Sequence, residues 1–167
     1  MKLIVFMSLF LIGSTNCLAG QTEHKEIQSV IDAFDHSIRT KDKSQFLSLF
    51  VDSSKPMIAV VTEAGLKVRQ ALVKKHNKEE NKNLVATRSF ELKPEEVIEM
   101  SLSRKTSSRE EMSNIKIISD GNIANVYFDY VYYIDNKKNN SGRESWQMIQ
   151  TLTGWRISSV IYSIDSK

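Results

Sequence analysis

The chain has 167 residues, of which 41% are hydrophobic and 26% are charged, and its formal net charge is +3. These values are typical of one globular domain and exclude a disordered chain. The densest basic cluster, residues 74–78, is followed directly by Glu79 and Glu80. This mixture favours a solvated helix face, so we expect no nucleic-acid partner.

Residues 1–19 have the pattern of a secretory signal peptide. Lys2 supplies a positive charge, residues 3–12 are almost entirely apolar, and Ala19 precedes the expected cleavage point. An uncleaved anchor is the alternative, but the apolar segment is shorter than the roughly twenty residues that span a bilayer. Lipid attachment at Cys17 is disfavoured, because no suitable small residue stands immediately before it.

Cleavage after Ala19 would leave a mature domain of residues 20–167 that contains no cysteine. Structural disulfides, thiolate nucleophiles and cysteine metal sites are then all excluded. The loss of Lys2, with no acidic residue in the leader, leaves a net charge of +2. We therefore predict a periplasmic or secreted protein with no stable membrane span after cleavage.

The first half of the mature chain predicts helices followed by a strand. A helix is expected over residues 22–39, and a short helix is expected after Asp42, whose side chain can cap it. Pro56 ends the second helix, and residues 57–62 predict a strand that is apolar on both faces and therefore buried. The first helix presents one apolar stripe at helical spacing, formed by Ile27, Val30, Ile31, Phe34 and Ile38.

The middle of the chain gives weaker patterns. A turn is predicted at Ala64-Gly65, followed by a helical or irregular segment around residues 71–73 and a strand over residues 86–92. Pro94 suits the first position of a short helix, since acidic residues follow it in the first turn. The polar residues 103–108 predict a surface connection.

From residue 115 onward the spacing of apolar residues changes to the period of two that β-strands require. Strands are predicted over residues 115–119, 123–134, 142–152 and 155–164, with tight turns at 120–121 and 153–154 and a polar loop after residue 134. In the longest strand neither face is uniformly polar, so we expect both faces to be covered. The whole pattern predicts one α+β domain, with helices mostly first and an antiparallel sheet last.

The C-terminal third resembles the nuclear transport factor 2-like (NTF2-like) superfamily, and its small bacterial SnoaL-like or lumazine-binding-like members most of all. The segments that carry the resemblance are residues 118–126, 130–133, 142–149 and 154–163. The resemblance implies a curved antiparallel sheet wrapped around about three helices, a cone-shaped cavity, and a homodimer formed through the sheet. It implies no single activity, because the superfamily includes isomerases, cyclases, dehydratases and non-catalytic binding domains.

The alternation of side chains along the last strands predicts which residues face the cavity. Glu144 shares a strand face with Trp146, so an inward tryptophan would bring the carboxyl group inward as a candidate general acid or base. The alternative is an exposed strand-end glutamate, or one paired with an arginine or lysine. Tyr130 and Tyr132 share the inward face with Phe128, and a buried tyrosine could donate a hydrogen bond to a ligand or to the protein itself.

His36 lies off the centre of the first helix's apolar stripe, where it could reach the edge of the cavity or remain on the surface. No histidine, aspartate or glutamate pattern has metal-ligand spacing, and no phosphate-binding loop occurs, so neither a metal nor a cofactor is expected. Asp129 falls on the face opposite Tyr130, which predicts a position in solvent or at a dimer contact.

Three functions are compatible with these features. The first is a domain that binds a small, mostly apolar molecule in its cone. The second is a cofactor-independent acid–base enzyme of the isomerase, cyclase or dehydratase type, with Glu144 and Tyr130 as the candidate catalytic residues. The third is a non-catalytic protein-interaction module, whose cavity would be plugged by Trp146, Phe128 and Tyr132.

Overall fold

The computed structural model describes residues 15–165, so most of the predicted leader, residues 1–14, lies outside the described residues. Within that range the chain forms four helices and six strands. The helices are α1 (Thr15–Thr40), α2 (Lys43–Ser48), α3 (Glu63–Glu80) and α4 (Pro94–Leu102). The strands are β1 (Met57–Val61), β2 (Ser89–Leu92), β3 (Ser108–Ser119), β4 (Ile123–Ile134), β5 (Lys137–Thr151) and β6 (Gly154–Ile164).

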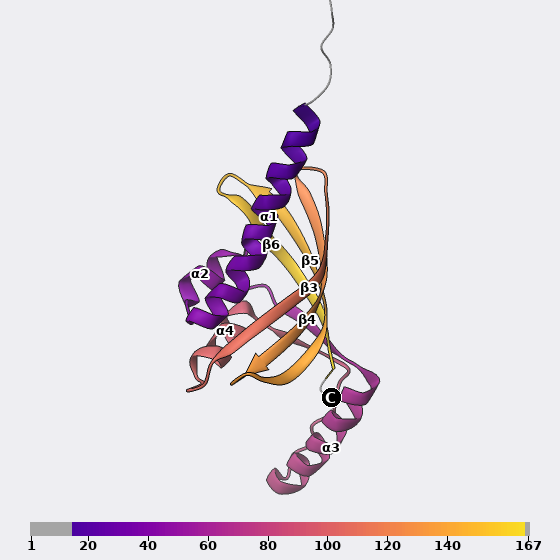
Figure 1. Ribbon diagram of the computed structural model, residues 1–167. Coiled ribbons are helices and arrows are strands. Elements are labelled where there is room, and N and C mark those ends of the chain that lie inside the picture. The colour runs from indigo at the N-terminus through magenta and orange to yellow at the C-terminus, as the bar shows by residue number, and fades with distance from the viewer. Residues whose placement is uncertain (1–14, 166–167) are drawn as a thin grey trace, which may run out of the picture.

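The six strands form one curved, unclosed sheet in the order β2-β1-β6-β5-β4-β3. Every neighbouring pair is antiparallel except β1 and β6, which run parallel. Helices α1, α2 and α4 lie against the concave side of the sheet, whereas α3 projects away from it (Figure 1). The predicted α+β cone is therefore confirmed, with one parallel pair inside a sheet that we expected to be antiparallel throughout.

The core lies between α1 and the concave face of β4, β5 and β6. The predicted apolar stripe of α1 is buried, and so are Ala124, Val126 and Phe128 on β4. Trp146 stands at the centre, with its ring centroid 5.0 Å from that of Phe34 and 5.0 Å from that of Phe128. Large aromatic rings in such contact contribute strongly to core stability. This cluster fills the half of the concave face near Ala124, and the packing opens towards the other end of β4.

Two predictions for the first half of the chain need correction. Strand β1 is buried on one face only, because Ile58 is 37% exposed beside Ile161 on the outer face of the sheet. Residues 63–80 form one continuous helix without the predicted turn. The side chain of Thr62 caps this helix by accepting a hydrogen bond from the amide of Gly65 at 3.3 Å. The sequence signal for the start of this helix was Thr62, because threonine commonly caps a helix by accepting a hydrogen bond from an amide three residues later.

Two boundaries in the second half also differ from the prediction. Strand β3 begins at Ser108, at the end of the predicted surface connection and seven residues before the predicted start of the strand at residue 115. The predicted polar loop after β4 is reduced to a turn at Asp135 and Asn136, whose φ angles of 52° and 58° are those of a tight hairpin. Polar residues thus begin β5 and extend the sheet instead of leaving it.

Gly142 on β5 is required by a close approach of the backbone. A Cβ atom at this position would lie 1.9 Å from the carbonyl oxygen of Ser163 on β6. The same carbonyl oxygen accepts a hydrogen bond from the hydroxyl of Tyr130 at 2.9 Å, and Tyr130 is the β4 partner of Gly142. The absence of a side chain at Gly142 therefore allows β4 and β6 to be linked across β5.

We predict that Gly142→Ala lowers the free energy of unfolding by about 2 kcal/mol or more, because the added methyl group overlaps a backbone atom that cannot move aside. Urea denaturation of the mature domain measures this change. Gly65→Ala is the matched control, since its Cβ would meet the nearest atom at an ordinary 3.4 Å inside a helix. The control should be neutral or stabilising by up to about 1 kcal/mol. Equal stability of Gly142→Ala and the wild type would contradict the argument.

Candidate functional site

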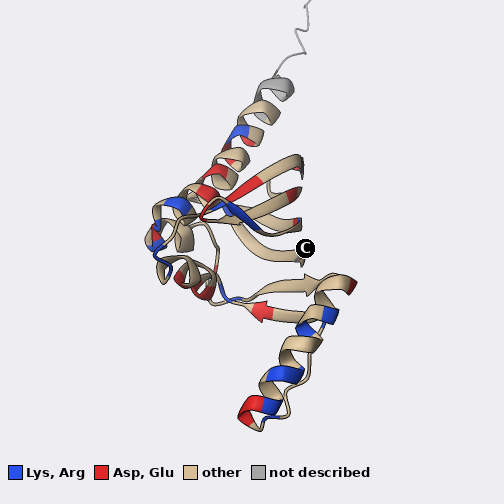
Figure 2. Ribbon diagram, turned by 60° about the horizontal axis from the view of Figure 1, so that its bottom comes forward, with Lys and Arg blue, Asp and Glu red and all other residues tan. Residues whose placement is uncertain are grey.

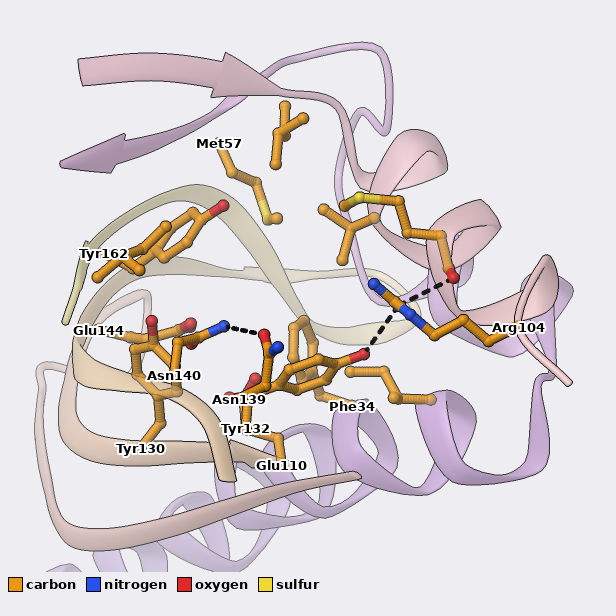
Figure 3. Close-up of a pocket in the computed structure, with 15 residues that line it drawn as sticks. Phe34, Met57, Arg104, Glu110, Tyr130, Tyr132, Asn139, Asn140, Glu144 and Tyr162 are labelled. Atoms are coloured by element: carbon orange, nitrogen blue, oxygen red, sulfur yellow. Dashed lines mark hydrogen bonds between the residues drawn. The ribbon is translucent and has the colours of Figure 1, made fainter. Parts of the chain in front are cut away.

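A cavity of about 210 Å³ opens beyond the aromatic core, between the second half of α1, helix α4 and the ends of the strands (Figure 3). Its walls are mostly apolar and aromatic, but polar side chains enter from β3, β4, β5 and β6 and from the segment that follows α4. The lining consists of Phe34, Ile38, Met57, Leu92, Val97, Met100, Arg104, Glu110, Tyr130, Tyr132, Asn139, Asn140, Glu144, Tyr162 and Ile164.

Glu144 enters the cavity from β5 and is 5% exposed. Its Oε2 atom accepts a hydrogen bond from Nε1 of Trp146 at 2.6 Å. Burial raises the pKa of Glu144 to about 7, although the hydrogen bond from Trp146 acts in the opposite direction. The prediction that Glu144 faces inward with Trp146 is confirmed, and the alternative of an exposed or cation-paired glutamate is wrong.

A second carboxyl group, Glu110 of β3, lines the same cavity and was missed in the sequence. Glu110 is 9% exposed, and its Oε1 atom has no hydrogen-bond partner. Its backbone amide donates to Oδ1 of Asp35 on α1 at 2.8 Å. Burial, followed by the nearby charges of Glu144 and Asp35, holds the pKa of Glu110 well above its usual range. The available signal was the inward alternation of Ser108, Glu110 and Met112.

Two tyrosines stand beside these carboxyl groups. The hydroxyl of Tyr130 donates to the Ser163 carbonyl, and the ring of Tyr162 lies edge-on at a centroid distance of 6.5 Å. Burial raises the pKa of both Tyr130 and Tyr162, and the charges of Glu144 and Glu110 raise it further. Both hydroxyls therefore remain protonated and can act only as neutral hydrogen-bonding groups. Tyr162 was not selected from the sequence, because its strand offered no polar neighbour on the inward face.

Arg104 follows α4 and supplies the positive charge of the lining. One of its terminal nitrogens, Nη1, donates to the carbonyl oxygen of Met100 at 2.9 Å and to the hydroxyl of Tyr132 at 3.4 Å (Figure 3). Asn139 and Asn140 complete the polar wall from the first residues of β5. Among the described side chains, the carboxyl groups of Glu110 and Glu144 therefore lie on the sheet side of the cavity, and the guanidinium group of Arg104 lies on the helix side.

The structure does not bring all the predicted residues to the cavity. Tyr130, Tyr132 and Glu144 line it, whereas Trp146 and Phe128 are fully buried in the core beside it. His36 is exposed on α1 and is not among the lining residues, because the buried face of the helix is occupied by Phe34 and Ile38. A ligand-binding role for His36 therefore has no geometric basis.

Asp129 lies on the outer face of the sheet, as its parity predicted. It accepts hydrogen bonds from Asn114 at 2.7 Å and from the guanidinium of Arg143 at 2.9 Å. These contacts lower the pKa of Asp129 and place it away from Tyr130. In the part of the chain that the structure describes, no three His, Cys, Asp or Glu side chains gather as metal ligands, and no helix is long and apolar enough to cross a bilayer.

Comparisons with known proteins place this geometry in a fold class. No protein-family model matches the chain, and no curated protein matches it in sequence. Among solved structures, Rv3472, a protein of unknown function from Mycobacterium tuberculosis, is 14% identical at a TM-score of 0.60, over 89% of this chain and 75% of that one. A proposed scytalone dehydratase from Novosphingobium aromaticivorans is 11% identical at a TM-score of 0.61, covering 89% and 88%.

A third similar structure is an NTF2-like superfamily protein from Salmonella enterica serovar Typhimurium. It is 20% identical at a TM-score of 0.56, over 89% of this chain and 94% of that one. The architecture is therefore that of a cone-shaped α+β domain with a cavity inside a curved sheet. It is the NTF2-like fold, as the sequence resemblance implied.

The buried Glu144 should make stability depend on pH. Its pKa is about 7 in the folded chain against an ordinary 4.5, so the folded state binds more protons between these values and stability falls as pH rises through 7. Glu144→Gln removes this penalty while keeping an acceptor for Trp146. The variant should gain up to about 3 kcal/mol over the wild type at pH 8 and almost nothing at pH 4.

Chemical denaturation at several pH values measures this difference. Glu111→Gln is the control for replacing a glutamate that is not buried, because Glu111 is exposed on β3 and pairs with Arg109. A constant difference between Glu144→Gln and the wild type from pH 4 to pH 8 would show that Glu144 is not buried as described.

Proposed function

We propose that this domain binds a small, mostly apolar molecule in the cavity between α1, α4 and the sheet. One observation carries the proposal: an apolar cavity of about 210 Å³ is lined by two buried carboxyl groups, neither of which forms an ion pair within the described residues. Buried carboxyl groups without an ion-pair partner destabilise the folded state, so the stability of the core does not explain why they are there. Convergent polar groups within an apolar pocket are typical of a ligand site.

The position of the aromatic core supports binding over a purely structural module. Trp146 and Phe128 pack against α1 beside the cavity and do not occupy it. Tyr132 is held at the wall by Arg104, so it too leaves the interior open. An interaction module with a plugged cavity therefore has less support than a ligand-binding domain.

Acid–base catalysis is the second candidate function, and the different environments of the two glutamates favour it. With a pKa of about 7, Glu144 is available as a base near neutral pH, while Glu110, whose pKa lies higher, is available as an acid. Similar structures include the proposed scytalone dehydratase and a proposed dehydratase from Streptomyces avermitilis. Mass spectrometry of the bound molecule before and after incubation tests turnover, and turnover that persists in Glu144→Gln would remove that residue from catalysis.

Blocking the cavity should abolish binding. Met100 lines the cavity and is 41% exposed, whereas Leu102, on the same helix, is 38% exposed and lies outside the lining. Met100→Trp should therefore reduce the amount of co-purifying ligand at least about tenfold by filling the entrance, while Leu102→Trp should leave it unchanged. Native mass spectrometry of the mature protein measures both. Equal ligand occupancy in the two variants would contradict binding in this cavity.

We also propose that the chain is exported and cleaved after Ala19. Among the residues of α1 whose burial is described, which begin at Gly20, the first buried one is Ile27, so the mature chain would keep the described apolar stripe. Intact-mass analysis of protein from the periplasm or medium should then give a chain that begins at Gly20. A cell-associated protein that retains Met1 or carries lipid on Cys17 would contradict this expectation.

The outer face of the sheet supports the proposed homodimer. Large apolar side chains are exposed on this face or at the hairpin between β3 and β4, among them Ile58, Ile118, Ile123, Tyr127 and Ile161. Light scattering of the mature domain at micromolar concentration should give twice the monomer mass, and Ile161→Glu should shift the protein to monomer by placing a charge in the interface. A wild-type monomer under these conditions would exclude the dimer.

A further inference from the structure

We infer that the ligand of this cavity is a small primary or secondary amine, with its protonated nitrogen directed to Glu110 and Glu144 and its apolar body against α1 and α4. The inference rests on the proposed binding function and specifies the chemical class of the ligand. Four features of the cavity support it: the unpaired carboxyl groups, the sign of the surrounding charges, the aromatic walls and the size.

The carboxyl pair has no counter-ion within the described chain. The ion pairs recorded there join other residues, and no cation contributes to the pKa of Glu110 or Glu144. Glu110 is more than nine-tenths buried, its residue lines the cavity, and its Oε1 atom has no hydrogen-bond partner. An acceptor left unsatisfied at this depth costs about 1–3 kcal/mol, which a ligand donor would recover.

The groups that surround the pair provide it with no ion-pair partner. Asp35 faces Glu110 from α1 and is itself paired with Arg39 at 3.0 Å, while Tyr130 from β4 and Tyr162 from β6 carry neutral hydroxyl groups. Arg104 lies on the α4 side of the cavity, where its guanidinium is held by the Met100 carbonyl and Tyr132. An anionic ligand end would thus be repelled from the glutamates, whereas an ammonium group would relieve the repulsion between them.

The remaining walls suit an organic cation rather than a metal ion. Phe34, Tyr130 and Tyr162 present aromatic rings to the cavity (Figure 3), and aromatic faces attract ammonium groups. Ile38, Met57 and Val97 provide apolar surface for the body of the ligand. A volume of about 210 Å³ lies below the roughly 300 Å³ at which drug-sized pockets begin, so the ligand is small.

Three probes of nearly the same shape test the inference: 2-phenylethylamine, its neutral analogue 2-phenylethanol, and the anion phenylacetate. Isothermal titration calorimetry of the mature protein at pH 7.5 gives their affinities. The amine should bind at least about tenfold more tightly than the alcohol, because only the amine forms charge-assisted hydrogen bonds, and phenylacetate should bind most weakly. Each comparison is made within one protein, so a change in stability does not affect the ratio.

Variants of the two glutamates locate the effect. Glu110→Gln and Glu144→Gln should each reduce the preference for amine over alcohol to about threefold or less, while leaving the affinity for the alcohol nearly unchanged. Glu111→Gln, on the outer face of the same strand as Glu110, should retain the full preference. Thermal melting verifies that each variant is folded before the titrations.

The outcomes separate this inference from the function on which it rests. If 2-phenylethanol binds as tightly as the amine, or if both glutamine variants keep the preference, the amine assignment is wrong and ligand binding in the cavity stands. If none of the three probes binds, the proposed binding function fails together with the inference.

Discussion

The hydrogen bond from Trp146 to Glu144 joins the core of the cone to the wall of its cavity. Trp146 is fully buried between Phe34 and Phe128, so its indole nitrogen has one position from which to donate. That position fixes Oε2 of Glu144 at 2.6 Å and leaves the rest of the carboxyl group at the cavity. The packing of the aromatic core therefore sets the orientation of the Glu144 carboxyl group. Substitutions in the core should be expected to alter the site even where they touch no ligand.

The acidic side chains Asp35, Glu110 and Glu144 follow one another from the surface of α1 to the wall of the cavity. Asp35 is partly exposed on α1 and pairs with Arg39 at 3.0 Å, while its other oxygen holds the backbone of Glu110. Glu110 borders both the shallow cleft that contains Asp35 and the cavity that contains Glu144. The charge of Asp35, which belongs to a surface ion pair, thus contributes to the raised pKa of Glu110. Such unfavourable burial is typical of sites whose polar groups serve a purpose other than stability.

Sequence patterns predicted the sheet well where strands alternate and turns carry their usual residues. The parity of β4 and β5 placed Tyr130, Tyr132 and Glu144 on the cavity side and Asp129 outside, and the structure agrees. The same reasoning missed Glu110, because Met112 is the only large apolar residue beside it on the inward face of a polar strand start, which therefore resembles a surface segment. Arg104 and the two asparagines were missed for a related reason: the mouth of a cavity is built from strand and helix ends, where polar residues are ordinary. The sequence left His36 between the cavity edge and the surface, where the structure has it, because helical spacing gives the direction of a side chain only to within a wide sector.

Side chains along β4 alternate between the two faces of the sheet, and this alternation affects how related sequences can diverge. Its even-numbered residues from Ala124 to Tyr132 pack in the core or line the cavity, whereas Ile123, Tyr127 and Asp129 lie on the outer face. A mutation at an inward-facing position of β4 alters the core or the cavity lining. A mutation at an outward-facing position alters only the outer surface of the sheet. Selection can therefore change the contents of the cone and the neighbours of the sheet separately, within a single stretch of twelve residues.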